Sequence, residues 1–346
     1  MSKPTLGIIG GGQLGSMLAV AANKLDIKTV VFCDDVDAPA QNFSNEFIHG
    51  DYNDQNKIIE FANKVDVITY EFENIPYKTL NKINKIKTVL PKPSVNRIIQ
   101  HRLAEKDFIN NLNIRTTRYV SIKNKSEMNS VEDLLPGLLK TVTMGYDGKG
   151  QQPVKDLIEV DNLDIDYSKD YILEKLVKLK KEISIIITRF GHQKYEIYEP
   201  IENVHEDQIL KHSKIPALIS DKILYQSKEW ASLIAEELKY VGTLCVEFFI
   251  DRNENLYVNE IAPRVHNSGH LTINAFNISQ FENHVRAVCN LEQIHLKKIS
   301  NAKMINIIGN QITVYRNKEL NQNEFFFDYL KKDIKKKKKN GSLNNT

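Results

Sequence analysis

Cysteine and tryptophan are scarce in this chain, which has three cysteines and one tryptophan among its 346 residues. Cys33, Cys245 and Cys289 are odd in number and lack the spacing of metal ligands. This usage excludes a disulfide framework and suits a reducing cytosol. No run reaches the roughly 18 apolar residues that span a bilayer, and the start of the chain does not read as a secretory leader. We therefore expect a cytoplasmic protein with no membrane partner.

Excess charge is also lacking, because 47 basic residues face 44 acidic ones and leave a net charge of +3. Part of that excess comes from the lysine run 335–339, so the rest of the chain is close to neutral. No broad basic footprint is present, and we expect no nucleic-acid partner. An internal repeat is absent, and so is a Walker phosphate loop, because no Gly-Lys pair is followed by serine or threonine.

The first hundred residues do carry a clear pattern, an alternation of strand and helix signals. This alternation predicts a parallel sheet with crossover helices. The expected strands are 5–9, 28–33 and 65–70, and the expected helices are 14–25 and 53–63. The length suits two or three domains, which we place at 1–98, 99–296 and 297–346.

A glycine-rich turn, Gly10-Gly11-Gly12-Gln13-Leu14-Gly15, joins the first expected strand to the first helix. It matches the pattern G-x-G-x-x-G, and Asp34 and Asp35 follow about twenty residues later, as in dinucleotide-binding proteins. The same turn can hold any anion at a helix N-terminus. Alone, it leaves a nicotinamide-dependent dehydrogenase and other anion-binding functions open.

A second glycine-rich segment, Gly145-Tyr146-Asp147-Gly148-Lys149-Gly150-Gln151, follows Lys140 on an apolar strand expected at 138–142. Glycine lets a backbone approach a phosphate chain closely, and Lys140 could neutralise those phosphates. An ordinary flexible turn beside a solvated lysine is the alternative.

Further expected helices are 97–112, 228–238 and 279–289, and further expected strands are 171–175, 183–190, 195–200, 304–308 and 311–315.

Two expected strands, 245–250 and 256–261, flank a turn and form a hairpin. Facing residues in an antiparallel hairpin have a constant index sum, so this turn places Glu247 opposite Glu260. Facing carboxylates, about 4.5–5.5 Å apart at Cβ, repel unless a proton or a cation lies between them. Oxygen ligands without a thiolate favour Mg²⁺ or Mn²⁺. Asn259 should point to the other face unless a bulge intervenes, and two solvated glutamates on an edge hairpin are the alternative.

A polar run, Asn259-Glu260-Ile261-Ala262-Pro263-Arg264-Val265-His266-Asn267-Ser268-Gly269-His270, ends this hairpin and continues into the next loop. It combines a carboxylate, amides, a guanidinium and two imidazoles. So many directional donors and acceptors predict a binding or catalytic site. Beside Arg264, we interpret both His266 and His270 as site residues rather than core histidines.

The order of these features resembles the ATP-grasp ligases: a strand lysine, a glycine loop, Glu174 followed by Glu182, and the carboxylate hairpin. Four motifs resemble one family within them, the N5-carboxyaminoimidazole ribonucleotide synthases. They are Gly10–Gly15, Tyr70-Glu71-Phe72-Glu73-Asn74, Gly145–Gln151 and Asn259–His270. The resemblance covers residues 5 to about 318. It implies an α/β ATP-grasp fold with an N-terminal Rossmann-like parallel-sheet domain, a lid at roughly 115–175 and a small C-terminal β-rich domain.

The resemblance implies ATP-dependent carboxylation of 5-aminoimidazole ribonucleotide with bicarbonate, through carboxyphosphate, in purine biosynthesis. It also implies Mg²⁺ as cofactor, with Mn²⁺ as a substitute, and a homodimer. The implied ATP-binding residues are Arg102, Lys140, the lid residues Gly145, Tyr146, Asp147, Gly148, Lys149, Gly150 and Gln151, the adenine hinge Glu174, Lys175, Leu176 and Val177, and Glu182 and His205. The implied metal ligands are Glu247 and Glu260, with Asn259 beside them. The implied catalytic residues around bicarbonate are Arg264, His266, Asn267 and Tyr146. The implied substrate contacts are Gln13, Leu14, Glu73, Asp147, Lys149 and Lys339.

The C-terminal end departs from the family's pattern R-P-G-R-K-M-G-H. The aligned stretch 335–342 keeps Lys339 and Gly341 but lacks the proline, the first glycine and the histidine. Lysine keeps the charge of arginine and loses its bidentate fork, so we expect weaker binding of the substrate phosphate and a trimmed or divergent third domain. The alternatives are a formate-dependent glycinamide ribonucleotide transformylase, another ATP-grasp carboxylate–amine ligase, a dehydrogenase, and an inactive nucleotide-binding module.

Overall fold

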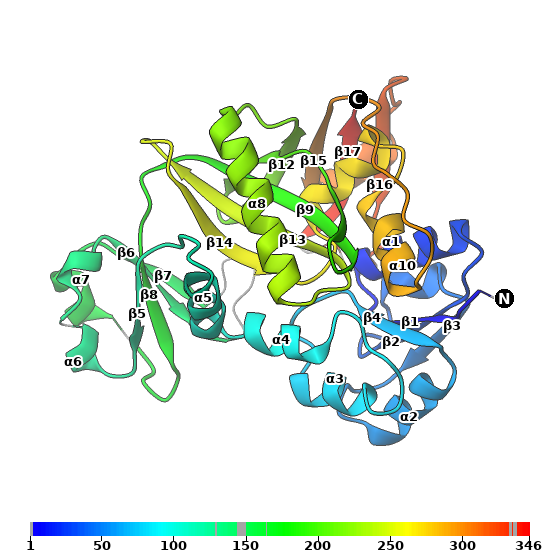
Figure 1. Ribbon diagram of the computed structural model, residues 1–346, viewed down its shortest axis with the longest axis horizontal. Helices are drawn as coiled ribbons and strands as arrows, with labels where there is room; N and C mark the ends of the chain where they lie inside the picture. Colours follow the sequence, from blue (N-terminus) through cyan, green and yellow to red (C-terminus); the bar gives the residue numbers. More distant parts are fainter. Residues whose placement is uncertain (1–2, 129, 144–149, 164, 332–333, 335–337) are drawn as a thin grey trace.

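The computed structural model describes residues 3–128, 130–143, 150–163, 165–331, 334 and 338–346. The strands within these ranges form three sheets, one parallel and two antiparallel. Figure 1 shows the parallel sheet and the smaller antiparallel sheet at opposite ends of the molecule, with the long antiparallel sheet between and above them. The predicted α/β class is confirmed. Within the same ranges, no helix combines the length and the apolar character needed to cross a membrane.

The N-terminal sheet is parallel and has the strand order β3-β2-β1-β4. Its strands are β1 (Leu6–Ile9), β2 (Thr29–Cys33), β3 (Glu46–His49) and β4 (Val67–Tyr70), and its helices are α1 (Gln13–Lys24), α2 (Gln55–Asn63) and α3 (Tyr77–Ile83), with a 3₁₀ turn η1 (Pro39–Asn42). The predicted alternation is therefore confirmed. The strand order reverses between β1 and β4, and ligands of such sheets bind at the carboxyl ends of the strands at that point.

The single helix expected at 97–112 is wrong, because the chain forms α4 (Pro93–Ile99) and then α5 (Arg102–Asn111). The helix is interrupted at Gln100 and His101. His101 Nδ1 accepts the Ala104 amide proton at 3.3 Å and thereby caps the new helix. This break places Arg102 in the first turn of α5.

The smaller antiparallel sheet has the order β5-β8-β6-β7 and occupies the region expected to form the lid. Its strands are β5 (Tyr119–Ile122), β6 (Gly137–Thr141), β7 (Gln151–Val154) and β8 (Tyr171–Lys175), accompanied by α6 (Lys125–Met128), η2 (Glu132–Leu134) and α7 (Leu157–Asn162). The sheet has its own apolar core around Leu139 and Leu173. Residues 176–178 connect it to the long sheet.

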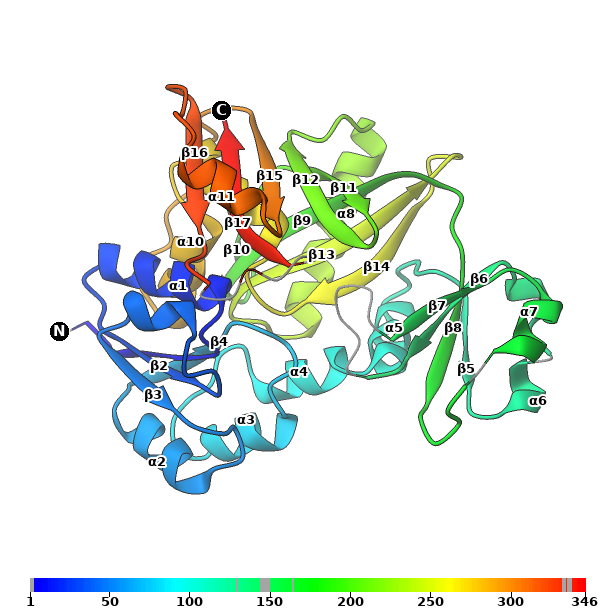
Figure 2. The same cartoon turned by 180° about the vertical axis from the view of Figure 1, so that it is seen from behind.

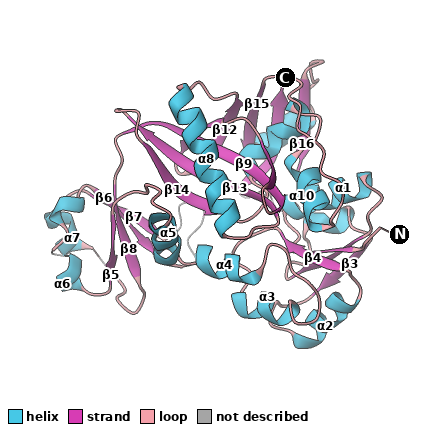
Figure 3. Cartoon of the chain, viewed as in Figure 1, coloured by secondary structure: helices cyan, strands magenta, loops and turns pink. Residues whose placement is uncertain are grey.

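The long sheet has the order β14-β13-β9-β11-β12-β15-β17-β16, and β10 pairs with β9 (Figure 2). Its strands are β9 (Leu179–Gly191), β10 (Lys194–Ile197), β11 (Ile201–Glu206), β12 (Ile209–Ile215), β13 (Gly242–Asp251), β14 (Leu256–Ala262), β15 (Ala302–Ile308), β16 (Glu324–Asp328) and β17 (Lys339–Asn345). The remaining helices are α8 (Asp221–Glu237), η3 (Asn267–Leu271), α9 (Thr272–Ala275), α10 (Gln280–Val288) and α11 (Gln311–Arg316). Helix α8 packs against β9, β13 and β14 around the main apolar core (Figure 3).

The C-terminal strands extend this long sheet. The strand expected at 311–315 is wrong, because these residues form α11 and bury Ile312 against Ile307 and Leu343. Strand β17 was not predicted, because its sequence is mostly polar. It lies between β15 and β16, so its backbone is paired on both edges, and the buried side chain of Asn344 donates to the His270 carbonyl at 3.0 Å and to Asn274 Oδ1 at 2.8 Å.

Candidate active site

A cavity of about 830 Å³ opens where the N-terminal sheet, the lid sheet and the long sheet meet. Its wall includes most of the described residues that the sequence predicted for the site. They are Gln13, Leu14, Glu73, Arg102, Lys140, Gln151, Glu182, His205, Glu247, Asn259, Glu260, Arg264, His266, Asn267 and Lys339. Segments far apart in the sequence therefore converge on one space, which is rich in both carboxylates and basic groups. The predicted lid residues Gly145, Tyr146, Asp147, Gly148 and Lys149 lie outside the described residues.

The carboxylate hairpin has the predicted register, with Glu247 of β13 paired to Glu260 of β14. A bulge follows at once, because Phe248 pairs with Val258 and leaves Asn259 without a facing residue. The bulge allows Asn259 and Glu260 to line the same cavity, which resolves the open question of where Asn259 points. Burial, and then the charge of Glu260, raise the pKa of Glu247 to about 7. This set of oxygen donors fits a hard divalent cation.

The loop after β14 brings a guanidinium and an amide to the cavity. Arg264 Nε donates to Glu73 Oε2 at 2.5 Å, so a carboxylate of the N-terminal domain orients it. Burial lowers the pKa of Arg264, but Glu73 raises it more, and the side chain stays charged. Asn267 is 6% exposed, and neither polar atom of its side chain has a hydrogen-bond partner among the described residues. A buried amide without hydrogen bonds destabilises the fold, and a polar ligand would provide the partners that this amide lacks.

His266 is a neutral hydrogen-bond donor in this site. Burial, followed by the charge of Arg264, lowers its pKa well below the usual value. The backbone N–H of Ser268 donates to Nδ1 at 3.3 Å, which assigns the ring proton to Nε2. Nε2 lies 3.2 Å from Glu247 Oε1, so the N–H points to the carboxylate pair.

His270 does not line the cavity, and our interpretation of it as a site residue is wrong. The residue is fully buried, and its Nδ1 lies 3.0 Å from the hydroxyl of Tyr329. Its ring also packs against Phe281. Burial lowers the pKa of His270 to about 3, so it acts as a neutral core residue that links the polar loop to the C-terminal strands.

Arg102 and Lys140 both line the cavity and are the cations that suit phosphate oxygens. Arg102 Nη1 lies 3.8 Å from Glu260 Oε2. Lys140 Nζ lies 3.0 Å from Glu174 Oε1, and a second lysine, Lys106, approaches the other carboxylate oxygen at 3.2 Å. Glu174 is itself buried and does not line the cavity. Its side chain positions Lys140, and Lys106 is a supporting residue that the sequence analysis missed.

Of the other predicted nucleotide residues, Gln151, Glu182 and His205 line the cavity, whereas Gly150, Lys175, Leu176 and Val177 do not. Lys175, Leu176 and Val177 lie at and just after the end of β8, on the link between the lid and the long sheet. Glu182 and His205 come from neighbouring strands, and His205 Nδ1 lies 2.5 Å from Glu182 Oε2. Burial lowers the pKa of His205, but Glu182 raises it more, to above the usual value. At the described edge of the lid loop, Gly150 has φ +71°, and Gln151 donates to Gln208 at 2.6 Å.

The N-terminal glycine turn is occupied by a carboxylate of the protein itself. Glu71, which follows β4, accepts the backbone N–H groups of Gly12 and Gly15, the latter at 2.6 Å. A Cβ at Gly10, where φ is +97°, would lie 2.5 Å from Glu71 Cγ. The helix N-terminus that would hold a dinucleotide pyrophosphate is thus already filled. The turn instead presents Gln13 and Leu14 to the cavity.

Basic residues of the C-terminal segment complete the wall. Lys331, Lys338 and Lys339 line the cavity, and Lys331 Nζ donates to the Lys339 carbonyl at 2.8 Å. Lys339 was predicted, whereas Lys331 was missed because it lies outside every motif. Gln208, Asn74 and Phe249 also line the cavity without having been predicted as site residues.

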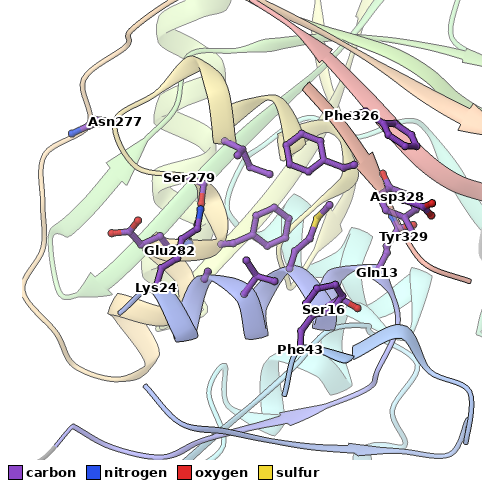
Figure 4. A pocket seen from close by; sticks show the side chains of 16 residues that line it. Gln13, Ser16, Lys24, Phe43, Asn277, Ser279, Glu282, Phe326, Asp328 and Tyr329 are labelled. Carbon is purple, nitrogen blue, oxygen red and sulfur yellow. Dashed lines mark hydrogen bonds between the residues drawn. The ribbon is translucent and has the colours of Figure 1, made fainter. Parts of the chain in front are cut away.

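A second cavity of about 430 Å³ lies beside α1 (Figure 4). Its wall is largely aromatic and aliphatic and includes Phe43, Phe281 and Phe326. Gln13 lines both cavities. The paired carboxylates and the buried arginine all belong to the larger cavity, which therefore has the groups needed for phosphate chemistry.

Comparisons with known proteins agree with this site. Residues 3–100 match the ribonucleotide synthetase preATP-grasp domain, and residues 107–281 match the ATP-grasp domain. The N5-carboxyaminoimidazole ribonucleotide synthase of Brucella melitensis is 39% identical over 313 residues, which cover 89% of this chain and 86% of the relative. The crystal structure of N5-carboxyaminoimidazole synthetase from Staphylococcus aureus complexed with ADP superposes with a TM-score of 0.91 at 34% identity, covering 99% of this chain and 92% of that one. An Aspergillus clavatus synthase in complex with ADP and 5-aminoimidazole ribonucleotide gives 0.89 at 26% identity, covering 99% and 94%.

Fold, carboxylate hairpin and domain matches define the chain as an ATP-grasp ligase. Within that class, it belongs to the N5-carboxyaminoimidazole ribonucleotide synthase family. The fold and the family predicted from sequence are confirmed.

Proposed function

We propose that this protein uses ATP to carboxylate 5-aminoimidazole ribonucleotide with bicarbonate, giving N5-carboxyaminoimidazole ribonucleotide, ADP and phosphate. The observation that carries the proposal is one cavity that holds both the Glu247–Glu260 pair and the Arg264–Asn267 loop. The glutamate pair suits a metal-bound nucleotide, and the Arg264–Asn267 loop suits a small planar anion beside that nucleotide. The names of the related proteins support the same reaction.

Bicarbonate is a poor electrophile, so it has to be activated before its carbon can be transferred. An oxygen of bicarbonate attacks the γ-phosphorus of ATP, the bond to the bridging oxygen breaks, and ADP leaves. The product is carboxyphosphate. The exocyclic amine of the ribonucleotide then attacks the carboxyl carbon, the bond between that carbon and the phosphate oxygen breaks, and the departing phosphate can accept the proton lost by the amine.

The oxygen donors of Glu247, Glu260 and Asn259 fit Mg²⁺ and would hold it, and the ion would supply positive charge for the phosphates of ATP. The protein itself contributes positioning and fixed charge. Arg102 and Lys140 provide cations for the phosphate oxygens, and Glu174 holds Lys140 in place. Because Glu247 is buried beside Glu260, a cation at this point relieves their repulsion.

Bicarbonate and carboxyphosphate lie against the polar loop in this proposal. Arg264, oriented by Glu73, balances the developing negative charge, and the amide of Asn267 obtains the partners that it lacks. The Nε2–H of His266 donates to oxygen at the carboxylate pair. Arg264 and Asn267 bind and orient the anion, whereas His266 orients Glu247 and is not the base, because its Nδ1 is already engaged by Ser268.

The ribonucleotide lies on the N-terminal side of the cavity in this proposal. Gln13, Leu14 and Glu73 face it from the carboxyl ends of β1 and β4, the position that suits ligands of a parallel sheet. Lys331, Lys338 and Lys339 line the same cavity and supply positive charge. They are suited to the ribose phosphate as point charges, without the bidentate geometry of arginine. The homodimer implied by the resemblance remains a prediction that sedimentation equilibrium can test.

Carbon-labelled bicarbonate tests the reaction directly. Purified protein with Mg²⁺, ATP and 5-aminoimidazole ribonucleotide should transfer the label to the ribonucleotide and release one ADP for each label fixed. Formate in place of bicarbonate should release no ADP. ADP release that depends on formate, or label fixation without ADP, would overturn the proposal.

A further inference from the structure

Three potential ligands of a different kind of metal lie together at the cavity, where Glu247 and His266 line the wall and Cys245 is buried beside them. Cys245 and Glu247 are two residues apart on β13, and alternate strand residues point to the same face. His266 reaches the same point from the loop after β14. The Cys245 sulfur, a Glu247 carboxylate oxygen and a His266 ring nitrogen all lie within 4.8 Å of one another.

The spacing of these atoms is close to that of a tetrahedral metal site. Metal–nitrogen and metal–oxygen bonds of about 2.1 Å place two tetrahedral ligands about 3.4 Å apart. His266 Nε2 and Glu247 Oε1 are already 3.2 Å apart. Only the sulfur has to approach, and Cys245 is at the end of a single rotatable side-chain bond.

The set of donors selects a different ion from the oxygen-only hairpin. Thiolate and imidazole ligands favour Zn²⁺ and related ions, whereas Mg²⁺ favours oxygen. We propose that Cys245, Glu247 and His266 bind a thiophilic divalent ion of the Zn²⁺ class, and that this ion inhibits the enzyme. The inhibition rests on the proposed function, because Glu247 would then be withdrawn from the site of Mg²⁺.

The groups around Cys245, Glu247 and His266 can accommodate a bound metal ion. Glu247 and His266 line the cavity, which gives the ion a path of entry and leaves its fourth position open to water. The ring must present the lone pair of Nε2 to the metal, and its proton then resides on Nδ1. Ser268 Oγ lies 2.9 Å from Nδ1 and can accept that proton in a hydrogen bond, which replaces the longer one that the Ser268 backbone N–H donates to Nδ1 at 3.3 Å. The Cys245 thiol loses one proton to solvent as the metal–sulfur bond forms.

The chain supplies its own control for the cysteine. Cys33, Cys245 and Cys289 are all free and buried. In the part of the chain that the structure describes, neither Cys33 nor Cys289 belongs to a group of three such ligands. Replacing Cys289 therefore removes a buried thiol without touching the proposed site.

Co²⁺ is a suitable probe because thiolate ligation to Co²⁺ gives a charge-transfer absorption band. Titration of the wild type with Co²⁺ should produce this band, and excess Zn²⁺ should abolish it by displacement. The band should be lost in Cys245→Ala and kept in Cys289→Ala. If Cys245→Ala does not fold, Cys245→Ser provides the test with nearly unchanged side-chain volume. A wild type without the band, or a Cys245 variant that retains it, would overturn the site.

Inhibition is measured separately, as ADP release at fixed Mg²⁺ and ATP with increasing Zn²⁺. The half-inhibiting Zn²⁺ concentration should rise at least about tenfold in Cys245→Ala and stay unchanged in Cys289→Ala. Equal inhibition of all three proteins would refute the inhibitory role. Because the Co²⁺ band needs no turnover, failure of the proposed reaction would leave the binding result interpretable.

Discussion

The buried carboxylate of Glu174 provides a quantitative test of how this active site is held together. Its oxygens lie 3.2 Å from Lys106 Nζ and 3.0 Å from Lys140 Nζ, and Thr117 donates to it at 2.8 Å. The side chains of Lys106 and Lys140 are 2% and 10% exposed. Glu174→Gln keeps the shape of the residue and removes the negative charge between two buried lysines.

Two arguments give the size of the effect. Removing one partner of a buried ion pair costs about 3–5 kcal/mol, because the remaining charge is left uncompensated. Burial raises the pKa of Glu174, but Lys106 and Lys140 lower it more, from 4.5 to about 2, which corresponds to about 3 kcal/mol. We therefore expect Glu174→Gln to lower the free energy of unfolding by about 3–5 kcal/mol.

Urea unfolding followed by circular dichroism at neutral pH measures this loss. Glu60→Gln is the matched control, because Glu60 pairs with Lys57 at 2.9 Å and both side chains are about 40% exposed; its cost should be at most about 1 kcal/mol. The unfolded state binds the Glu174 proton more tightly than the folded state, so the difference between wild type and Glu174→Gln should be full above pH 4.5 and shrink as the pH falls towards 2. A loss no larger than that of the control would refute the buried-pair reasoning.

Two further predictions concern substrate binding. Glu71→Gln should raise KM for the ribonucleotide at least about tenfold and leave KM for ATP nearly unchanged. The reason is that Glu71 holds the turn that presents Gln13, and each backbone hydrogen bond to a charged group is worth about 1.5–3 kcal/mol. Steady-state kinetics measures both KM values, and equal rises would contradict the prediction. Asn267→Ala should raise KM for bicarbonate about tenfold without lowering the melting temperature, because the Asn267 amide has no hydrogen-bond partner among the described residues. A destabilised variant with unchanged KM for bicarbonate would count against the anion-binding role.

Local sequence patterns predicted much of the site. The register of Glu247 and Glu260 follows from the short turn between their strands, because a tight turn fixes the pairing of everything near it. The glycine turn before α1 was likewise visible as a local signal. Whether a bulge occurs at Asn259 could not be decided from the sequence, because no residue type at that position is diagnostic of one.

Features that depend on distant contacts could not be predicted. Lys106 reads as an ordinary helical lysine, and only the fold brings Glu174 to it. The polar strand β17 has no hydrophobic alternation, so its place between β15 and β16 is decided by backbone pairing. Ile312, Thr313 and Val314 favour a strand by their β-branched side chains, yet packing of Ile312 against the C-terminal strands selects a helix. His266 and His270 are histidines of the same polar run. The sequence does not show that His266 lines the cavity and that His270 does not.

The most direct test of the central claim is substrate-stimulated ADP release by the wild type beside Glu260→Gln. Glu254→Gln is the control, because Glu254 lies in the turn of the same hairpin and pairs with Lys180 away from the cavity. With Mg²⁺, 5-aminoimidazole ribonucleotide and bicarbonate, we predict turnover by the wild type and by Glu254→Gln. Glu260→Gln should lose at least about 100-fold, a rise of about 2.7 kcal/mol in the barrier. A wild type that releases no ADP in response to both substrates, or a Glu260→Gln variant as active as the control, would contradict the assignment of this cavity as an ATP-driven carboxylation site.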